Sequence, residues 1–305
     1  MKLYTAGVYT SNFDIDGRLF NRLTDVEKDS RRGIKHYLES YHYIQKQSFI
    51  DLLRKDGKQV FLDSGAYSAF TKGVDVSLKD YCLYIQENED IILKDDGVVV
   101  ASVLDAIGDP LQTWRNQNAM ERLGVSPLPC FHYGDDERYL QDYISRYDHI
   151  TLGGMVPIPN PLVRVWLDRL WEKYLTDGAG RPRLKVHGFG LMTEYFLKDY
   201  PWYSTDSSTW VQKALNGILL GFTLPDLHIS DNSPRTKVQN QHFNTMPDAY
   251  KKLYVQDITN RGYSIERLQQ NYASRWSYNI QIMNELNYKY ENADIKFQIK
   301  QKGIF

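Results

Sequence analysis

The feature that most constrains the fold is an alternation of short apolar or β-branched runs with longer amphipathic stretches. This alternation is typical of repeated βα units, in which helices cover a parallel sheet. The runs with the composition of buried strands are Leu3–Tyr9, Gln59–Asp63, Val98–Leu104, Leu128–His132, His149–Leu152, Leu184–His187, Trp202–Thr205 and Gly217–Phe222. Eight such runs predict an α/β fold, a (β/α)8 barrel of the TIM type.

The stretches between these runs have helical periodicity, and several begin at a capping residue or a proline. They are Ser77–Asn88, Pro110–Leu123, Glu137–Arg146, Pro161–Leu175 and Thr193–Lys198. A polar loop, Asp231–Thr245, follows the eighth run and leads to helical segments near Pro247–Tyr254 and Ser264–Tyr290. We therefore expect a barrel domain over residues 1–230 and a C-terminal helical cap over residues 231–305 that packs on it.

Composition limits the possible environments and partners. With 305 residues and 42% hydrophobic content, the chain can bury one large core. The 37 basic and 38 acidic residues nearly cancel, so attraction to phosphate needs a local patch, and residues 231–305 are net basic. Cys82 and Cys130 lie in apolar segments, which argues against a disulfide framework. No apolar run has the length of a signal peptide or membrane span, so we expect a cytoplasmic protein without a membrane partner.

The residues that follow the apolar runs are unusually polar, and in such barrels reactive groups lie at the carboxyl ends of strands. These residues are Asp63-Ser64-Gly65-Ala66-Tyr67, Asp105, His132-Tyr133-Gly134, Gly153-Gly154-Met155, His187-Gly188-Phe189-Gly190 and Asp206-Ser207-Ser208. Each has an ordinary alternative, since such an aspartate often caps the next helix, a glycine pair often forms a turn, and a histidine often packs. The coincidence of three aspartates at the same ends favours a shared site.

Two carboxylates that face one cavity suit reactions at an anomeric carbon, where one stabilises the reacting centre and the other moves a proton. Tyr67 and Phe189 beside them favour a flat ligand, because aromatic faces can sandwich a heterocycle. This chemistry leaves sugar hydrolysis and base exchange both open. A barrel that binds nucleic acid without catalysis is a third possibility.

The same residues form ordered motifs that resemble those of the tRNA-guanine transglycosylases. The segment 61–68 resembles the family's D-S-G-G-[FY]-Q, with Ala66 replacing the second glycine and Ser68 the glutamine. The segments 152–155 and 185–190 resemble its G-G-L turn and its H-L-M-G-V-G strand end. Segments 103–105 and 203–207 occupy the places of its base-reading aspartate and its nucleophile. Order and spacing agree from about Val60 to Ser208, roughly half of the chain.

The resemblance implies a role for each matching residue. Asp206 would attack C1′ of a nucleotide and hold it covalently, and Asp63 would move protons to and from the base. Asp105 would accept hydrogen bonds from the N–H groups of the base. The other residues implied in base binding are Ser64, Tyr67, His132, Tyr133, Gly153, Gly154, Met155, His187, Gly188 and Phe189. His132 or Tyr133 stands where the family carries a glutamine.

The sequence departs from the family after Asp206. The C-x-C-x2-C cluster and distant histidine that bind structural zinc in the tRNA enzymes are missing, and His228 and His242 make a weak substitute, so we expect no metal and no cofactor. The arginine-rich recognition loop is also missing, although Arg235 and Lys237 could serve in part to bind nucleic acid.

A compact chain without zinc is similar to the phage-type enzymes that place 7-deazaguanines in DNA. The expected partners are DNA, favoured over tRNA, and a 7-deazaguanine base of the preQ0 or preQ1 type, with a homodimer possible. The gene would then be carried by a phage and the protein would act in the host cytoplasm. Four C-terminal aromatic residues could hold the flanking strand or could simply pack: Tyr263, Tyr272, Trp276 and Tyr278.

Overall fold

The computed structural model describes residues 1–156 and 158–298, which form two compact units. Unit 1 contains Met1–Thr10, His36–Ser207 and the described residues from Tyr290 onward. Unit 2 contains Ser11–Lys35 and Ser208–Lys289. Compactness does not show which segments fold independently, so the division into domains 1–230 and 231–305 stays a prediction. None of the helices in the described ranges is long and apolar enough to cross a membrane.

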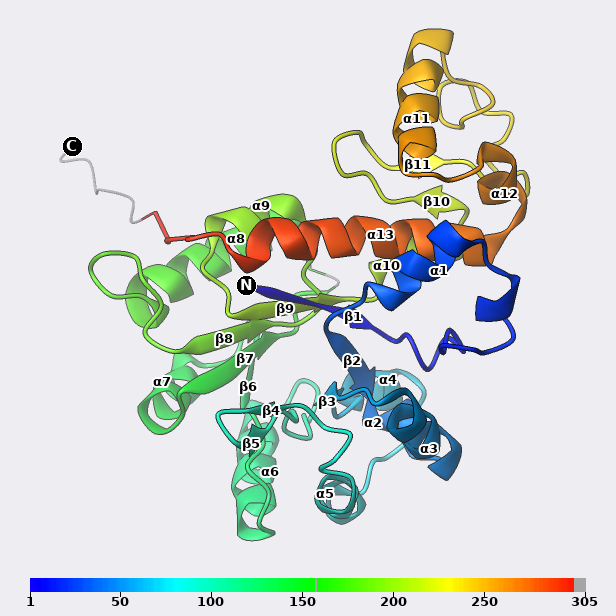
Figure 1. Ribbon diagram of the computed structural model, residues 1–305. Coiled ribbons are helices and arrows are strands. Elements are labelled where there is room, and N and C mark those ends of the chain that lie inside the picture. The colour runs from blue at the N-terminus through cyan, green and yellow to red at the C-terminus, as the bar shows by residue number, and fades with distance from the viewer. Residues whose placement is uncertain (157, 299–305) are drawn as a thin grey trace, which may run out of the picture. The chain divides into compact units, whose positions relative to one another are not determined.

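Unit 1 is a mixed α/β structure with a curled, seven-stranded parallel sheet (Figure 1). Its strands are β1 (Lys2–Ala6), β2 (Tyr37–Ser40), β3 (Val60–Asp63), β6 (Cys130–His132), β7 (His149–Gly153), β8 (Lys185–Gly188) and β9 (Ser204–Ser207). They are ordered β3-β2-β1-β9-β8-β7-β6, and all neighbouring pairs are parallel. The prediction of a parallel α/β fold is therefore confirmed at this coarser level.

Two details of the predicted sheet are wrong. The run Gly217–Phe222 is not a strand of the parallel sheet, because β10 (Ile218–Leu219) pairs antiparallel with β11 (Leu227–His228) in unit 2. The sheet instead contains β2, which pairs with β1 and β3. β2 was not predicted because a charged residue, Glu39, occupies one of its buried positions.

The run Val98–Leu104 is divided into two parts. Its start, β5 (Val98–Val99), forms a short antiparallel hairpin with β4 (Lys94–Asp95). The residues that follow form isolated parallel bridges to both edges of the sheet, Ala101 to Leu62 and Ser102 to Leu128. The Ser102 N–H donates to the Leu62 carbonyl at 2.9 Å, and the Val103 N–H donates to the Leu128 carbonyl at 2.9 Å.

Helices alternate with these strands as predicted. Those of unit 1 are α2 (Tyr41–Ile44), α3 (Gln47–Asp56), α4 (Ala66–Thr71), α5 (Leu78–Glu87), α6 (Pro110–Arg122), α7 (Glu137–Arg146), α8 (Asn160–Leu170), which continues into the π-helix η2 (Trp171–Leu175), and α9 (Glu194–Asp199). Side chains of Ser77, Asp109 and Asp136 accept backbone N–H bonds at the first turns of α5, α6 and α7. These caps fix where the helices begin, because they satisfy donors that have no partner within the helix.

Two apolar clusters hold unit 1 together. One lies between β6–β8 and the helices α7 and α8, where Phe131 stacks on Trp166 with ring centroids 6.0 Å apart. The other joins residues from several strands and from the bridging segment: Tyr4, Ala6, Leu38, Phe61, Val100 and Leu128. Alternate residues of a strand point to opposite faces of the sheet. Ser40 and Asp63, which lie two positions after Leu38 and Phe61, therefore share a face with this second cluster.

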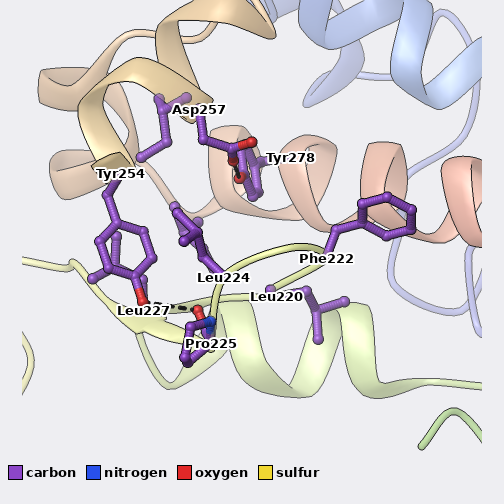
Figure 2. A pocket seen from close by; sticks show the side chains of 11 residues that line it. Leu220, Phe222, Leu224, Pro225, Leu227, Tyr254, Asp257 and Tyr278 are labelled. Atoms are coloured by element: carbon purple, nitrogen blue, oxygen red, sulfur yellow. Dashed lines mark hydrogen bonds between the residues drawn. The ribbon is translucent and has the colours of Figure 1, made fainter. Parts of the chain in front are cut away.

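Unit 2 consists mainly of helices. Its elements are the 3-10 helix η1 (Phe20–Arg22), α1 (Asp25–Arg32), α10 (Thr209–Leu215), β10, β11, α11 (Asp248–Asn260), α12 (Ile265–Gln270) and most of α13 (Tyr272–Glu291). The helical segments predicted near Pro247–Tyr254 and Ser264–Tyr290 are confirmed, with a break at Asn271. Between the β10–β11 hairpin and helices α11 and α13 lies a cavity of about 10 Å³, lined by Leu220, Tyr254 and Tyr278 among others (Figure 2). Its size suits about one water molecule and not a base.

Candidate functional site

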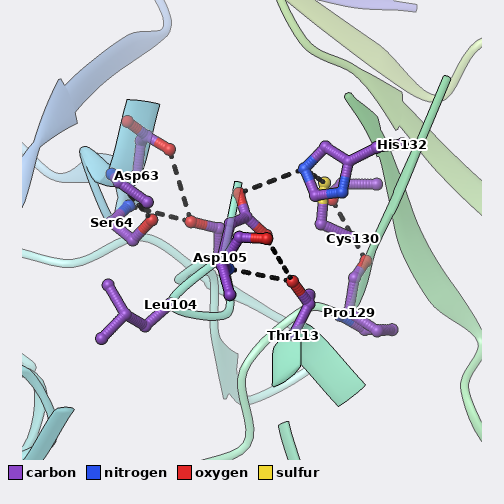
Figure 3. A network of polar contacts seen from close by, with 12 residues as sticks. Asp63, Ser64, Leu104, Asp105, Thr113, Pro129, Cys130 and His132 are labelled. Atoms are coloured by element: carbon purple, nitrogen blue, oxygen red, sulfur yellow. Dashed lines mark hydrogen bonds and ion pairs between the residues drawn. The ribbon is translucent and has the colours of Figure 1, made fainter. Parts of the chain in front are cut away.

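The Asp63 carboxylate lies at the carboxyl end of β3 between hydroxyl groups from both sides. Ser40, its neighbour in β2, donates to Oδ2 at 2.6 Å, and the Gly65 N–H donates to the same oxygen at 3.0 Å. Ser102 of the bridging segment donates to Oδ1 at 3.4 Å and accepts from the Ser64 N–H at 2.9 Å (Figure 3). The sheet therefore fixes the position of this carboxylate on two sides.

A tight turn after β3 makes this arrangement possible. Gly65 has a φ of +72°, and a Cβ at this position would lie 2.6 Å from Cβ of His42. Gly65 is also the residue that precedes α4, so Asp63 is not the N-cap of that helix. The residues that precede α6 and α10 are Asp109 and Ser208. The helix-cap alternative therefore fails for Asp63, Asp105 and Asp206 alike.

Burial changes the protonation of Asp63. Burial and, to a smaller extent, the charges of Asp105 and Asp206 raise the pKa of this carboxyl to about 6, and the hydrogen bonds from Ser40 and Gly65 oppose this rise. These electrostatic interactions indicate that the three aspartates lie near one another. A carboxyl group with a pKa near 6 can both release and accept a proton close to neutral pH.

Asp206 is a buried carboxylate on β9 with a fixed Oδ1 atom. The Gly190 N–H donates to Oδ1 at 2.9 Å, and His187 Nε2 lies 3.3 Å from the same oxygen. Gly190 has a φ of +71°, a conformation that glycine adopts without strain and that directs its N–H toward the carboxylate. Both contacts engage Oδ1.

His187 is fully buried and is oriented through its other ring nitrogen. Its Nδ1 atom lies 2.8 Å from the Ser204 hydroxyl, in the neighbouring strand β9. Its ring contacts Phe61 and Phe189, with centroids 4.6 Å away in each case. These contacts make His187 a positioning residue for Asp206. Phe189, which is partly buried, adds an aromatic face near the same group.

A second polar cluster lies beside Asp63 and contains Asp105, His132 and Cys130 (Figure 3). His132 Nε2 is 3.5 Å from Asp105 Oδ2 and 3.5 Å from Cys130 Sγ. On the other side of the ring, Nδ1 is 3.5 Å from Asp135 Oδ2, and the same oxygen accepts the His132 backbone N–H at 3.1 Å. The ring of His132 is therefore held between two carboxylates.

Protonation of this cluster follows from its charges. Burial opposes a charge on His132, but Cys130, Asp105 and Asp135 together raise the pKa of the ring above its ordinary value. Because burial also raises the pKa of the Cys130 thiol, this thiol is neutral near pH 7 and the carboxylates are the cause that matters. When no ion is bound, the two carboxylates therefore favour the protonated form of His132.

Gly153 and Gly154 leave the space that this cluster occupies. A Cβ on Gly153 would lie 3.0 Å from both Cys130 Sγ and His132 Cδ2. Gly154 has a φ of +69°, and its Cβ would lie 3.1 Å from Cβ of His132. The two glycines were expected to take part in base binding, and the structure adds a steric reason for the absence of side chains at both positions. Gly188 is similarly confined, since a Cβ there would lie 2.9 Å from the Trp202 ring.

The remaining predicted base-binding residues lie in varied surroundings. Tyr67 on α4 is 55% exposed, and Tyr133 packs on Trp166 with ring centroids 5.4 Å apart. Met155 and Ser64 are buried. The side chains of Met155, Ser64 and Tyr133 therefore belong largely to the packing around the site, whereas Tyr67 is accessible.

Residues predicted to contact nucleic acid lie in unit 2, where Arg235 and Lys237 are both exposed. Of the four C-terminal aromatic residues, Tyr263, Trp276 and Tyr278 are buried and Tyr272 is 42% exposed. The packing alternative therefore holds for three of them. His242 is an unsuitable metal ligand, because its ring nitrogens bond to the Ser230 carbonyl and the Asn244 N–H, at 3.0 and 3.1 Å.

Four residues of the site were not predicted: Ser40, Ser102, Cys130 and Asp135. The buried Glu39, which precedes Ser40 on β2 and faces the opposite side of the sheet, was not predicted either. Cys130 had a readable signal, because it lies two residues before His132 on a strand and therefore on the same face. Glu39 had no signal of this kind. It is fully buried, accepts the Tyr9 N–H at 2.7 Å, and burial raises its pKa to about 7.

No protein-family model matches the chain, and no curated protein matches it significantly.

Proposed function

We propose that this protein exchanges guanine in a nucleic acid for a 7-deazaguanine, through a covalent glycosyl intermediate on Asp206. The observation that carries the proposal is the group of three aspartates near the carboxyl ends of parallel strands, in which the pKa of one is about 6. Asp63 supplies a proton donor and acceptor, and Asp206 supplies an oriented carboxylate. The order of the motifs that contain them resembles that of the tRNA-guanine transglycosylases.

The proposed reaction has two balanced steps. In the first, Oδ2 of Asp206 attacks C1′, the glycosidic C–N bond breaks, and protonated Asp63 gives its proton to the departing guanine. In the second, Asp63 removes a proton from the incoming base, whose nitrogen attacks C1′ and displaces Asp206. Contacts of Oδ1 with Gly190 and His187 hold the carboxylate in place and leave Oδ2 for the attack.

Base recognition would use Asp105, whose Oδ1 atom is buried and has no hydrogen-bond partner among the described residues. An N–H group of the base would satisfy this oxygen. Phe189 and the accessible Tyr67 would stack on the faces of the heterocycle. The target nucleotide has to leave the stack of a duplex to reach this site, which costs a few kcal/mol.

Beyond the seven-stranded parallel sheet, we infer a closed (β/α)8 barrel, in which residues 100–103 take the place of the eighth strand. Their bridges to Leu62 and Leu128 support this inference, since they connect the two edges of the sheet. The sequence after Asp206 lacks a cysteine cluster for zinc and favours DNA over tRNA as the polymer. A phage-encoded enzyme that works in the host cytoplasm, alone or as a homodimer, fits this proposal.

The test is incorporation of a radiolabelled 7-deazaguanine or guanine into DNA and, in parallel, into tRNA. We expect label in the polymer with the unmodified protein and a loss of at least about 100-fold with Asp206→Asn. Asp51→Asn, which changes an exposed carboxylate on α3, is the matched control and should keep full activity. Absence of label in both polymers would refute base exchange. A glycoside hydrolase with the same carboxylates would release sugar and would gain no thermal stability from a purine.

A further inference from the structure

Asp105, Cys130 and His132 form a cluster that resembles a metal site more than a chance contact. Each offers one ligand atom, and these atoms all lie within 4.8 Å of one another. Cys130 and His132 lie two residues apart on β6, and Asp105 ends the segment that bridges to the same region of the sheet. Thiolate, imidazole and carboxylate are the ligands that Zn²⁺ takes in proteins.

The two separations from His132 Nε2 match those between neighbouring ligands of a tetrahedral zinc ion. Zinc bonds of about 2.3 Å to sulfur and about 2.0 Å to nitrogen or oxygen place neighbouring ligand atoms about 3.3–3.6 Å apart. His132 Nε2 lies 3.5 Å from Cys130 Sγ and 3.5 Å from Asp105 Oδ2. The same imidazole nitrogen therefore faces both other ligand atoms at separations that one zinc ion can span.

The surroundings of His132 provide the support that a ligating imidazole needs. Its Nδ1 atom faces the Asp135 carboxylate at 3.5 Å, which leaves Nε2 to point at Cys130 and Asp105. A carboxylate behind the imidazole is the usual second partner of a zinc-bound histidine, because it fixes the ring and increases its basicity. The Asp135 carboxylate is itself fixed by the His132 backbone N–H at 3.1 Å.

Two further observations show that the cluster is built into the fold. Cys130 is buried, and Gly153 has no side chain where a Cβ would come within 3.0 Å of the sulfur and the imidazole. Asp105 directs Oδ2 at the same imidazole nitrogen that faces Cys130 Sγ, so all three groups converge on one point.

We propose that Asp105, Cys130 and His132 bind one Zn²⁺ ion, with the fourth position open. Binding requires the Cys130 thiol and the protonated Nε2 of His132 each to lose a proton, and both protons are released to solvent. Three protein ligands with one open position are typical of zinc that polarises a substrate or a water molecule. This inference does not depend on base exchange. If both hold, Oδ2 of Asp105 contacts the ion and Oδ1 remains for the base.

The test uses the full chain, first stripped of metal with a chelator and then titrated with Zn²⁺ or Co²⁺. Mass spectrometry of the metal content after removal of unbound ion should give about one zinc per chain. Co²⁺ should produce the near-ultraviolet absorption of a thiolate-to-cobalt transition. Cys130→Ser should abolish this absorption, whereas Cys82→Ser, which changes the other buried cysteine, should retain it.

A second variant keeps the test decisive if Cys130→Ser fails to fold. Asp135→Asn leaves all three ligands in place and should weaken zinc binding by about 10–100-fold, while far-ultraviolet circular dichroism shows that the metal-free protein keeps its fold. Absence of stoichiometric zinc in the unmodified protein, or a cobalt spectrum without the thiolate band, would overturn the proposal. Because no nucleic acid is added, a failure here is separate from a failure of base exchange.

Discussion

At the scale of single residues, Asp63 is the group whose protonation most affects the molecule. The pKa of its carboxyl is about 6 in the folded chain, whereas the ordinary value, which applies to the unfolded chain, is 3.8. Between these two pH values the native state therefore binds more protons than the unfolded state. Stability contributed by this group therefore falls as pH rises from about 4 to 6. Above about pH 6 the buried charge of Asp63 lowers the free energy of unfolding by an amount that no longer changes with pH.

Asp63→Asn should remove this penalty. We expect the free energy of unfolding at pH 7 to rise by up to about 3 kcal/mol, with little change near pH 4, because the neutral amide can still accept bonds from Ser40 and Gly65. Urea unfolding between pH 4 and 8 measures the difference. In the same variant base exchange should fall by about 100-fold or more, since the amide cannot transfer a proton.

The exposed Asp51→Asn variant is the control for both measurements. If Asp63→Asn shifts stability equally at pH 4 and pH 7, the carboxyl does not titrate in this window. If it keeps full exchange activity, Asp63 is not the proton carrier.

At the scale of elements, the carboxyl end of β7 is packed against that of β6. Gly153→Ala should destabilise the fold by about 1–3 kcal/mol, because its Cβ would lie 3.0 Å from Cys130 Sγ and His132 Cδ2. Gly178→Ala is the matched control, since a Cβ there meets nothing within 4 Å. Chemical denaturation of the two variants measures the difference. Equal stability would mean that β6 and β7 separate readily at this end.

The elements also show what the sequence could and could not reveal. Strands such as β7 and β8 were predictable because each is a short run built around β-branched or apolar residues and is followed by a glycine-containing turn. β2 was not, because Glu39 is satisfied by backbone N–H groups of another segment that no local pattern shows. Gly217–Phe222 is equally apolar, but its partner, β11, lies only a few residues further on and forms a hairpin with it.

The same distinction applies to the site. Asp63, Asp105 and Asp206 were predictable because each follows an apolar run, and parallel strands end at one edge. Ser102 and Asp135 were not, because their roles depend on contacts across the sheet or on a turn. For Cys130 the sequence showed only that it lies in an apolar segment, and its 3.5 Å separation from His132 is what gives it a chemical role.

At the scale of the whole molecule, the state of the sheet between β3 and β6 decides how firmly the site is held. Residues 100–103 connect these two strands through single bridges, and Ser102 touches Asp63 directly. If the bridges persist in solution, the sheet closes into a barrel and Asp63 is supported on both sides. If they do not, its support comes only from Ser40 in β2.

Hydrogen exchange distinguishes these two states. In a closed barrel the amides of Ser102, Val103 and Leu128 can exchange only when the sheet opens. The reason is that they donate to the carbonyls of Leu62, Leu128 and Ala101, respectively, at 2.7–2.9 Å. We therefore expect them to exchange as slowly as the central amides of β1 and β9, when followed by NMR or mass spectrometry. The short β4–β5 hairpin is the internal control and should exchange quickly, since it has only two residues in each strand. Exchange of the bridging amides at the hairpin's rate would mean an open sheet, and the eighth strand inferred from residues 100–103 would have to be abandoned.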